Sequence, residues 1–254
     1  MSLFESILLG ALEGATEFLP ISSTGHLILA SSLLGIEQTT FVKSFEILIQ
    51  CGAILAIVAL CWRSLLHTER IKKLAVAFVP TGIVGFLLYP FIKTYLLGNT
   101  SVVLWALFLG GVILIALEWW HKEEVVEGEV NDVTYSQSLF IGLFQALSII
   151  PGVSRAGATI VGGLLLGLRR TVIVEFSFLL AIPTMLAATG YDIAKNIEIF
   201  TWDNAALLGA GFLTSFVVAL VAAMWLMRYV QTHSFTLFGI YRILLVLVFV
   251  LFVV

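Results

Sequence analysis

The sequence predicts an all-α integral membrane protein built as an inverted-topology repeat, with three spans and one re-entrant helical hairpin in each half. Hydrophobic residues make up 60% of the 254 residues and charged residues 11%, whereas a soluble domain is about half apolar and about a quarter charged. Long apolar runs recur along the chain, and two shorter ones are interrupted by proline and polar residues. The net charge of −3 gives no indication of a nucleic-acid partner.

Six segments are long enough to cross a bilayer, which takes about 20 mostly apolar residues. These segments are 41–62, 74–97, 101–120, 172–194, 205–228 and 236–254. Regions 2–35 and 135–168 instead contain two short apolar stretches on either side of a polar break with proline. Non-helical backbone at membrane depth is tolerated only inside protein or beside a water-filled cavity. We therefore expect each broken region to form a re-entrant hairpin.

The two broken regions resemble each other, which predicts a duplicated chain. "LGALEGATEFLPISSTGHL" can be aligned with "IGLFQALSIIPGVSRAGAT". The alignment pairs Gly10 with Gly142, Glu13 with Gln145 and, after a gap of one residue, Pro20 with Pro151 and Ser23 with Ser154. We expect a single membrane domain, 1–254, with repeats 1–121 and 133–254 joined by the acidic linker 122–132. Three spans per repeat invert the second copy, so the hairpin tips should meet near the midplane.

The basic residues predict the orientation of the chain in the membrane. Eight of them fall on one side of the predicted spans: Arg63, Arg70, Lys72, Lys73, Lys122, Arg169, Arg170 and Arg228. Three fall on the other side, Lys43, Lys93 and Lys195, and two lie inside segments, Arg155 and Arg242. Basic loops are cytoplasmic, so both termini and the first hairpin should lie on the outer side of the membrane.

The first hairpin carries two acids and a polar run. Glu13 and Glu17 lie one helical turn apart, where two carboxylates can share a divalent cation or one can transfer a proton. The alternative is an amphipathic helix at the membrane surface with both acids in water. After Pro20, "SSTGH" is typical of a helix start. Ser23 and His26 can supply a nucleophile, a base or a phosphate contact, or serve only as a cap and a polar contact.

The second hairpin contains "PGVSRAGAT", which combines hydroxyl groups with one arginine. Ser154 and Thr159 offer hydrogen-bond donors, and Arg155 stands alone in a long apolar neighbourhood. A buried guanidinium needs a carboxylate or phosphate partner. The alternative is a structural salt bridge between Arg155 and Glu13 or Glu17.

Together, the two tips favour binding of a phosphate or diphosphate with a divalent metal. Helix N-termini attract anions, and a bridging cation reconciles the carboxylates with an anionic ligand. Secondary transporters are also built from inverted repeats with broken helices. A transporter or flippase of a phosphorylated lipid is therefore the alternative function. The set of acids, serine, histidine and arginine exceeds what anion binding needs, which favours hydrolysis.

These residues resemble the signatures of the undecaprenyl-diphosphate phosphatase family, also called bacitracin-resistance proteins. The resemblance rests on "LEGATEFLPISSTGHLIL" and "PGVSRAGATI", and it extends to "FEILIQCGAILA" and "EFSFLLAIPTM". It implies hydrolysis of undecaprenyl diphosphate to undecaprenyl phosphate and inorganic phosphate, which recycles the lipid carrier of cell-wall synthesis and confers bacitracin resistance. It also implies a divalent cation, Mg²⁺ or Ca²⁺, and a fold with six spans and two re-entrant hairpins.

The resemblance also implies a role for each site residue. Glu13 and Glu17 would hold the metal, and the catalytic residues would be Glu17, Ser23, His26 and Arg155. The substrate-binding residues would be Ser22, Thr24, Ser154, Arg155 and Thr159. The sequence departs from the family at Ala156, where serine is frequent. The expected partners are a polyprenyl diphosphate and membrane lipid, and a homodimer is compatible with the sequence. Arg242, inside the last span, is expected either to support the site residues or to pair helices.

Overall fold

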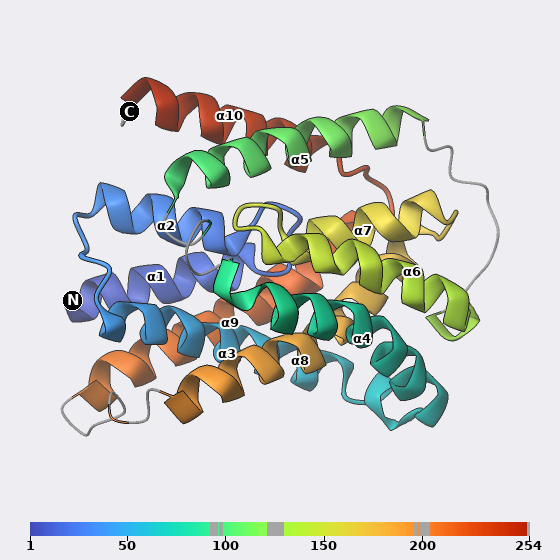
Figure 1. Ribbon diagram of the computed structural model, residues 1–254, viewed down its shortest axis with the longest axis horizontal. Coiled ribbons are helices and arrows are strands. Elements are labelled where there is room, and N and C mark those ends of the chain that lie inside the picture. The colour runs from blue at the N-terminus through green and yellow to red at the C-terminus, as the bar shows by residue number, and fades with distance from the viewer. Residues whose placement is uncertain (92–95, 97–98, 121–129, 196–197, 199–203, 253–254) are drawn as a thin grey trace.

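The computed structural model describes residues 1–91, 96, 99–120, 130–195, 198 and 204–252, and the regular secondary structure in these residues is helical (Figure 1). The predicted all-α class is therefore confirmed. The ten α-helices of the described residues are α1 (Leu3–Thr16), α2 (Ser23–Leu33), α3 (Thr40–Cys61), α4 (Thr68–Phe91), α5 (Thr100–Trp120), α6 (Tyr135–Ala146), α7 (Arg155–Leu165), α8 (Arg170–Lys195), α9 (Ala205–Tyr229) and α10 (Thr236–Phe252).

Five described helices, α3, α4, α5, α8 and α9, are long and apolar enough to cross a membrane. The sixth predicted span, 236–254, corresponds to α10, which is apolar but has 17 residues. The predicted start of the span 74–97 is wrong, because α4 begins at Thr68. The polar segment before residue 74 is helical too, and Glu69 and Lys72 form an ion pair of 2.7 Å across its first turn. Most of the predicted linker, 122–129, lies outside the described residues, as do Lys93 and Lys122.

The outer surface of the long helices is apolar. Phe86 on α4 is 84% exposed, and Trp119 and Trp120 at the end of α5 are 93% and 83% exposed. Side chains of this size are rarely left open to water in such numbers. Such side chains are stable beside lipid, and tryptophan is enriched near the ends of membrane spans.

The four short helices form two pairs, α1 with α2 and α6 with α7. The pairs approach the middle of the molecule from opposite ends (Figure 1). Each pair begins with a capping box, in which Ser2 and Glu5, or Thr134 and Gln137, bond each other's backbone amides. We call residues 17–23, from the end of α1 to the first residue of α2, the first tip, and residues 150–155, up to the first residue of α7, the second tip. The polar residues singled out in the sequence cluster at these tips.

Each pair packs against a long helix from the other half of the chain, because small residues let the backbones approach. Helix α1 lies on α9, where a Cβ atom added at Gly10 would come 3.0 Å from the Gly211 Cα. Helix α6 lies on α4, where a Cβ atom at Gly142 would clash with the backbone carbonyl of Ala77. Close contact between small residues is a usual means of helix association in membranes. These contacts interlock the two halves of the chain.

Helices α5 and α10 lie side by side along one edge of the molecule (Figure 1). Glu118 near the end of α5 joins three helices at one point. Its carboxylate accepts two hydrogen bonds from Arg170 at the start of α8, of 3.1 and 2.6 Å, and one of 2.8 Å from the Phe235 amide before α10. A two-pronged pair of this kind has a fixed geometry, so it sets where α10 begins.

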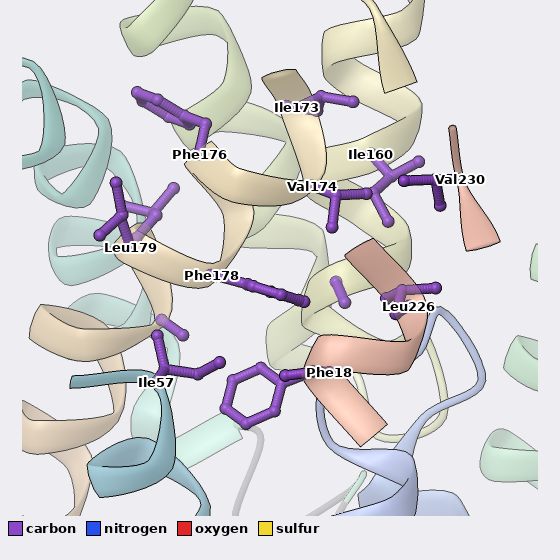
Figure 2. Close-up of a cluster of buried hydrophobic side chains, with 14 of the residues drawn as sticks. Phe18, Ile57, Ile160, Ile173, Val174, Phe176, Phe178, Leu179, Leu226 and Val230 are labelled. Carbon is purple, nitrogen blue, oxygen red and sulfur yellow. The ribbon is translucent and has the colours of Figure 1, made fainter. Parts of the chain in front are cut away.

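The largest apolar cluster of the described residues reaches the first tip. Figure 2 shows Phe18 beside Ile57, Phe178 and Leu226, which come from α3, α8 and α9. The rings of Phe18 and Phe178 meet edge to face, with centroids 5.3 Å apart. Because Phe18 follows Glu17 and Phe178 follows Ser177, this packing fixes the backbone next to two polar residues of the candidate site.

We expect Gly142→Ala to destabilise the protein, because the added methyl group meets the Ala77 carbonyl and forces α6 away from α4. Overpacking of this kind costs about 1–3 kcal/mol. Gly209→Ala is the matched control, since a Cβ atom at Gly209 in α9 would meet nothing within 4 Å. Thermal unfolding in one detergent measures both variants, and equal stability of the two would contradict the close α4–α6 contact.

Candidate active site

The first tip turns the chain from the end of α1 into α2. Glu17 caps the C-terminus of α1, and Ser23 is the first residue of α2. Between them, Ser22 has a φ angle of 69°, which residues with a side chain rarely adopt. Its hydroxyl oxygen accepts a hydrogen bond of 3.3 Å from the Gly25 amide and so caps α2. The expected helix start is therefore confirmed, with Ser22 as the cap in place of Ser23.

The second tip repeats this geometry. Ser154 has a φ angle of 76°, and its hydroxyl oxygen accepts a hydrogen bond of 3.0 Å from the Gly157 amide at the start of α7. Ser154 thus corresponds to Ser22, and Arg155 corresponds to Ser23. The one-residue gap in the sequence alignment, which paired Ser23 with Ser154, is wrong, because two serines with the same strained capping conformation define the match.

Glu17 connects the two tips. One carboxylate oxygen accepts a short hydrogen bond from the Ser23 hydroxyl. The other lies 3.3 Å from a guanidinium nitrogen of Arg155, across the boundary between the two pairs. The Glu17 and Arg155 side chains are 8% and 9% exposed. A serine hydroxyl paired with a carboxylate that is itself held by a cation is an arrangement that can activate a nucleophile.

Arg155 is held in place by three groups. Besides Glu17, it donates a hydrogen bond of 2.8 Å to the backbone carbonyl of Ser177 on α8. Its guanidinium carbon lies 5.7 Å from the centre of the Phe18 ring. Among the described residues, the Nε atom has no hydrogen-bond partner. The salt bridge to Glu17 that the sequence raised as an alternative is present, and a donor remains for a ligand.

Thr159 lies one turn further along α7 and is fully buried. Its hydroxyl group hydrogen-bonds with the Ser177 hydroxyl at 2.7 Å and donates to backbone carbonyls of its own helix. These contacts join α7 to α8 beside Arg155. Ser177 was not singled out in the sequence, where a serine inside an apolar span gives no signal. The predicted contact of Thr159 with substrate stays a prediction.

Glu13 lies one turn before Glu17 on α1, with its side chain facing the interior and 0% exposed. Its electrostatic neighbours include Glu17, Glu46 and Arg155. Within the described part of the chain, neither carboxylate oxygen has a hydrogen-bond partner. The alternative of an acid that faces water at the membrane surface is therefore wrong for Glu13. A buried acid in this state calls for a proton or a cation.

The donor set at this position fits a divalent cation in one specific way. No group of three or more His, Cys, Asp or Glu residues suited to a metal occurs in the described ranges. Mg²⁺, however, is often bound by one or two carboxylates together with substrate phosphates and water. Glu13 offers two open oxygens, and Glu17 stands beside it. The pair suits a metal that arrives with a phosphorylated ligand.

Both ring nitrogens of His26 have hydrogen-bond partners other than Ser23. Its Nδ1 atom lies 2.7 Å from the backbone carbonyl of Ser22, and its Nε2 atom lies 2.8 Å from the hydroxyl of Tyr241 on α10. A carbonyl oxygen only accepts, so Nδ1 carries the proton, and Nε2 of the neutral ring accepts from Tyr241. Thr24, the residue after Ser23, is exposed at the start of α2. The catalytic role of His26 stays a prediction that requires Tyr241 to give way.

Arg242 was expected either to support the site residues or to pair helices, and it lies at the centre of this region. Its guanidinium group donates to backbone carbonyls of both tips and of α5. An arginine inside the apolar segment 236–254 is a signal that the sequence contains. The hydrogen-bond partners of Arg242 could not be predicted from the sequence, because every residue has a backbone carbonyl and the residue type does not show which carbonyls lie near the guanidinium.

A family model described as "Bacitracin resistance protein BacA" matches residues 6–248. The chain belongs to this family. It is 49% identical to the "Undecaprenyl-diphosphatase" of Aquifex aeolicus over 253 residues, which cover 99% of each chain. It is 51% identical to the protein of the same name from Wolinella succinogenes, over 98% of this chain and 97% of that one. The protein of that name from Persephonella marina is 51% identical over the full length of both.

Proposed function

We propose that this protein is an undecaprenyl-diphosphate phosphatase, which hydrolyses undecaprenyl diphosphate to undecaprenyl phosphate and inorganic phosphate. Membership of the BacA family and relatives of the same length with that name support the activity. The single observation that carries it is the contact of Glu17 with both the Ser23 hydroxyl and Arg155. A lipid-phosphate carrier needs no carboxylate on a serine hydroxyl, so the contact favours hydrolysis over transport.

We assign a step to each residue, and the contacts support the assignment. Glu17 accepts the proton of the Ser23 hydroxyl as the serine oxygen attacks the terminal phosphorus. The bond from that phosphorus to the bridging oxygen breaks, and undecaprenyl phosphate leaves. Water then attacks the phosphorus bound to Ser23, the bond from that phosphorus to the serine oxygen breaks, the serine oxygen takes its proton back from Glu17, and inorganic phosphate leaves. Arg155 stabilises charge on the transferring group, because its planar guanidinium can contact two phosphate oxygens at once.

The helix starts at both tips offer a further contact for the diphosphate. The first amides of a helix have no carbonyl partner within the helix, and the helix dipole favours negative charge there. Helices α2 and α7 begin at Ser23 and Arg155, and these two residues are joined through Glu17. Ser22 and Ser154 hold the two starts in shape through their caps. We propose that the side chains of Ser22 and Ser154 cap the two helices, and that the first backbone amides of α2 and α7 bind the ligand.

Glu13 and Glu17 would hold the divalent cation of this reaction, Mg²⁺ or Ca²⁺. The open, buried oxygens of Glu13 are the observation that supports this assignment. When bound, such a cation neutralises negative charge on the diphosphate that the two acids alone would repel. Arg155 balances part of the charge of the acids in the absence of a ligand.

We expect the purified protein to release phosphate from undecaprenyl diphosphate, to stop when a chelator is added, and to resume with Mg²⁺. Glu13→Gln keeps the size of the side chain but removes its charge, so it should lower the rate and raise the Mg²⁺ concentration needed for half-maximal rate. Glu69→Gln is the control, because Glu69 forms an exposed pair with Lys72. Full activity in chelator would refute the metal assignment, and absence of phosphate release would refute the function.

Arg155→Lys should lower kcat by about 10²-fold while the folded protein remains stable, because lysine keeps the charge but loses the two-pronged contact. Phosphate release and thermal unfolding are measured on the same preparation. Arg63→Lys, at an exposed arginine beside the Trp62 ring, is the matched control and should keep kcat near that of the parent. Near-normal turnover of Arg155→Lys, or loss of stability in parallel with loss of activity, would leave Arg155 only a structural bridge to Glu17.

We further propose that the two short-helix pairs are re-entrant hairpins of an inverted repeat in the bacterial inner membrane. The equivalences at the tips support this. Ser154 follows Ser22 in the sequence by the same number of residues as Gly142 follows Gly10. The capping boxes at Ser2 and Thr134 have this separation too, so corresponding features recur at a constant distance along the chain. The opposite approach of the pairs and the location of both chain ends at one end of the molecule are further support (Figure 1).

In this orientation both termini lie outside the cell and residues 122–134 lie in the cytoplasm. Cysteine labels placed at residue 1 and residue 254 should therefore react with a membrane-impermeant reagent in intact spheroplasts. A label at residue 132 should react only after lysis. The background for this experiment is a Cys51→Ala, Cys61→Ala parent, since both cysteines are free. Termini labelled from opposite sides would overturn the inverted repeat.

A further inference from the structure

Arg242 on α10 is 1% exposed, and all five of its N–H donors are used. Each goes to a backbone carbonyl at 2.8–3.2 Å. The acceptors are Leu107 for Nε, Pro20 and Val153 for one terminal nitrogen, and Ala106 and Gly152 for the other. One guanidinium thus joins the first tip, the second tip and α5.

These carbonyls lie next to the residues that carry out the proposed chemistry. Pro20 precedes the cap Ser22 by two residues, and Val153 directly precedes the cap Ser154. Each cap is followed at once by a reacting residue, Ser23 or Arg155. The position of the guanidinium therefore sets the separation of the two helix starts. It also sets the distance between the Arg155 guanidinium and the Glu17 carboxylate, which is 3.3 Å between a terminal nitrogen and an oxygen.

A ligand for the phosphate is a different role, and the geometry argues against it. Every N–H group of Arg242 already points at a carbonyl, so a contact with substrate would leave a buried carbonyl without a donor. Arg155 differs, because its Nε atom has no partner in the described residues. The two buried arginines therefore have different roles. Arg155 has a donor left for the ligand, and Arg242 binds the backbone carbonyls around the site.

Gly110 on α5 makes room for this side chain. A Cβ atom added at Gly110 would clash with a terminal nitrogen of Arg242 and lie 2.6 Å from its central carbon. Gly110 and Arg242 are separated by the same number of positions as Ser22 and Ser154. In the proposed repeat Gly110 of the first half therefore corresponds to Arg242 of the second half, and the guanidinium of Arg242 occupies the space beside Gly110. A single residue can reach both tips because it lies where the two halves meet.

We propose that Arg242 is a positioning residue for the phosphatase site, which aligns Ser23 and Glu17 of one tip with Arg155 of the other through five backbone carbonyls. The inference rests on the proposed function for its effect on catalysis. Its structural part, the coupling of two tips that lie about 130 positions apart in the sequence, can be measured without a substrate.

Two variants disturb Arg242 in different ways. Arg242→Lys keeps the positive charge but has three N–H donors, so at least two carbonyls lose their partner. Gly110→Ala keeps every functional group and displaces the guanidinium by steric contact. Gly209→Ala is the matched control for an alanine in a long helix, because its Cβ atom meets nothing within 4 Å.

Each protein is purified in the same detergent. Phosphate release from undecaprenyl diphosphate with Mg²⁺ gives kcat and KM, and hydrogen–deuterium exchange reports the backbone amides of residues 17–26 and 150–159. We expect both variants to exchange faster at the two tips together and to lose about 10²-fold in kcat, the scale of an ångström-sized displacement of reacting groups. Combined with Arg155→Lys, either variant should cost less than the product of the single losses, because both disturb the same alignment.

Normal exchange at the tips, or faster exchange at only one of them, would overturn the coupling. Normal kcat with faster exchange would overturn the positioning role. Multiplicative losses with Arg155→Lys would also count against it, because a merely structural defect lowers the amount of active enzyme independently. If Arg242→Lys does not fold, Gly110→Ala decides alone. A parent that releases no phosphate would refute the proposed function, whereas the exchange measurement would still test Arg242.

Discussion

The structure depends on one constraint: buried backbone groups must find hydrogen-bond partners at the two turns where a helix is interrupted inside the molecule. Each short-helix pair turns inside the molecule, where the turn residues Pro20, Ser22, Gly152 and Ser154 are buried. An unsatisfied backbone group in such a place costs several kcal/mol. The amides are satisfied by the hydroxyl groups of Ser22 and Ser154, and the carbonyls by the guanidinium of Arg242. Without these partners the breaks would be too costly to keep.

The same solution creates the chemistry of the site. A serine cap leaves the next residue at the start of a helix, with its side chain at the tip and its amide open to an anion. In the first pair this residue is Ser23, and in the second it is Arg155. Two similar backbone positions thus present a hydroxyl group and a cation, and Glu17 contacts both. In the proposed function, the similar geometry of the two helix starts positions these groups, and their different side chains carry out the reaction.

The positive charges of the two buried arginines are stabilised in different ways. Arg242 is solvated by carbonyl dipoles, whereas Arg155 is paired with a carboxylate and retains a donor. Glu13, in turn, keeps two open oxygens beside this pair. The described part of the site is therefore incomplete in two complementary respects, a donor for an anion and an acceptor for a cation. A diphosphate with a divalent metal satisfies both, which is why the proposed substrate fits the site electrostatically.

The sequence by itself determined the class of fold, the long apolar helices, the two broken regions and the identity of most polar residues at the tips. These follow from composition and from local rules, because bilayer thickness, serine capping and intramembrane charge act over a few neighbouring residues. Only the tertiary structure decided which serine caps each helix, that His26 faces Tyr241, that Ser177 supports Arg155 and Thr159, and that Arg242 joins both tips. These contacts depend on backbone carbonyls and on helices far apart in the chain, and residue types do not encode which carbonyl lies within reach of a buried donor.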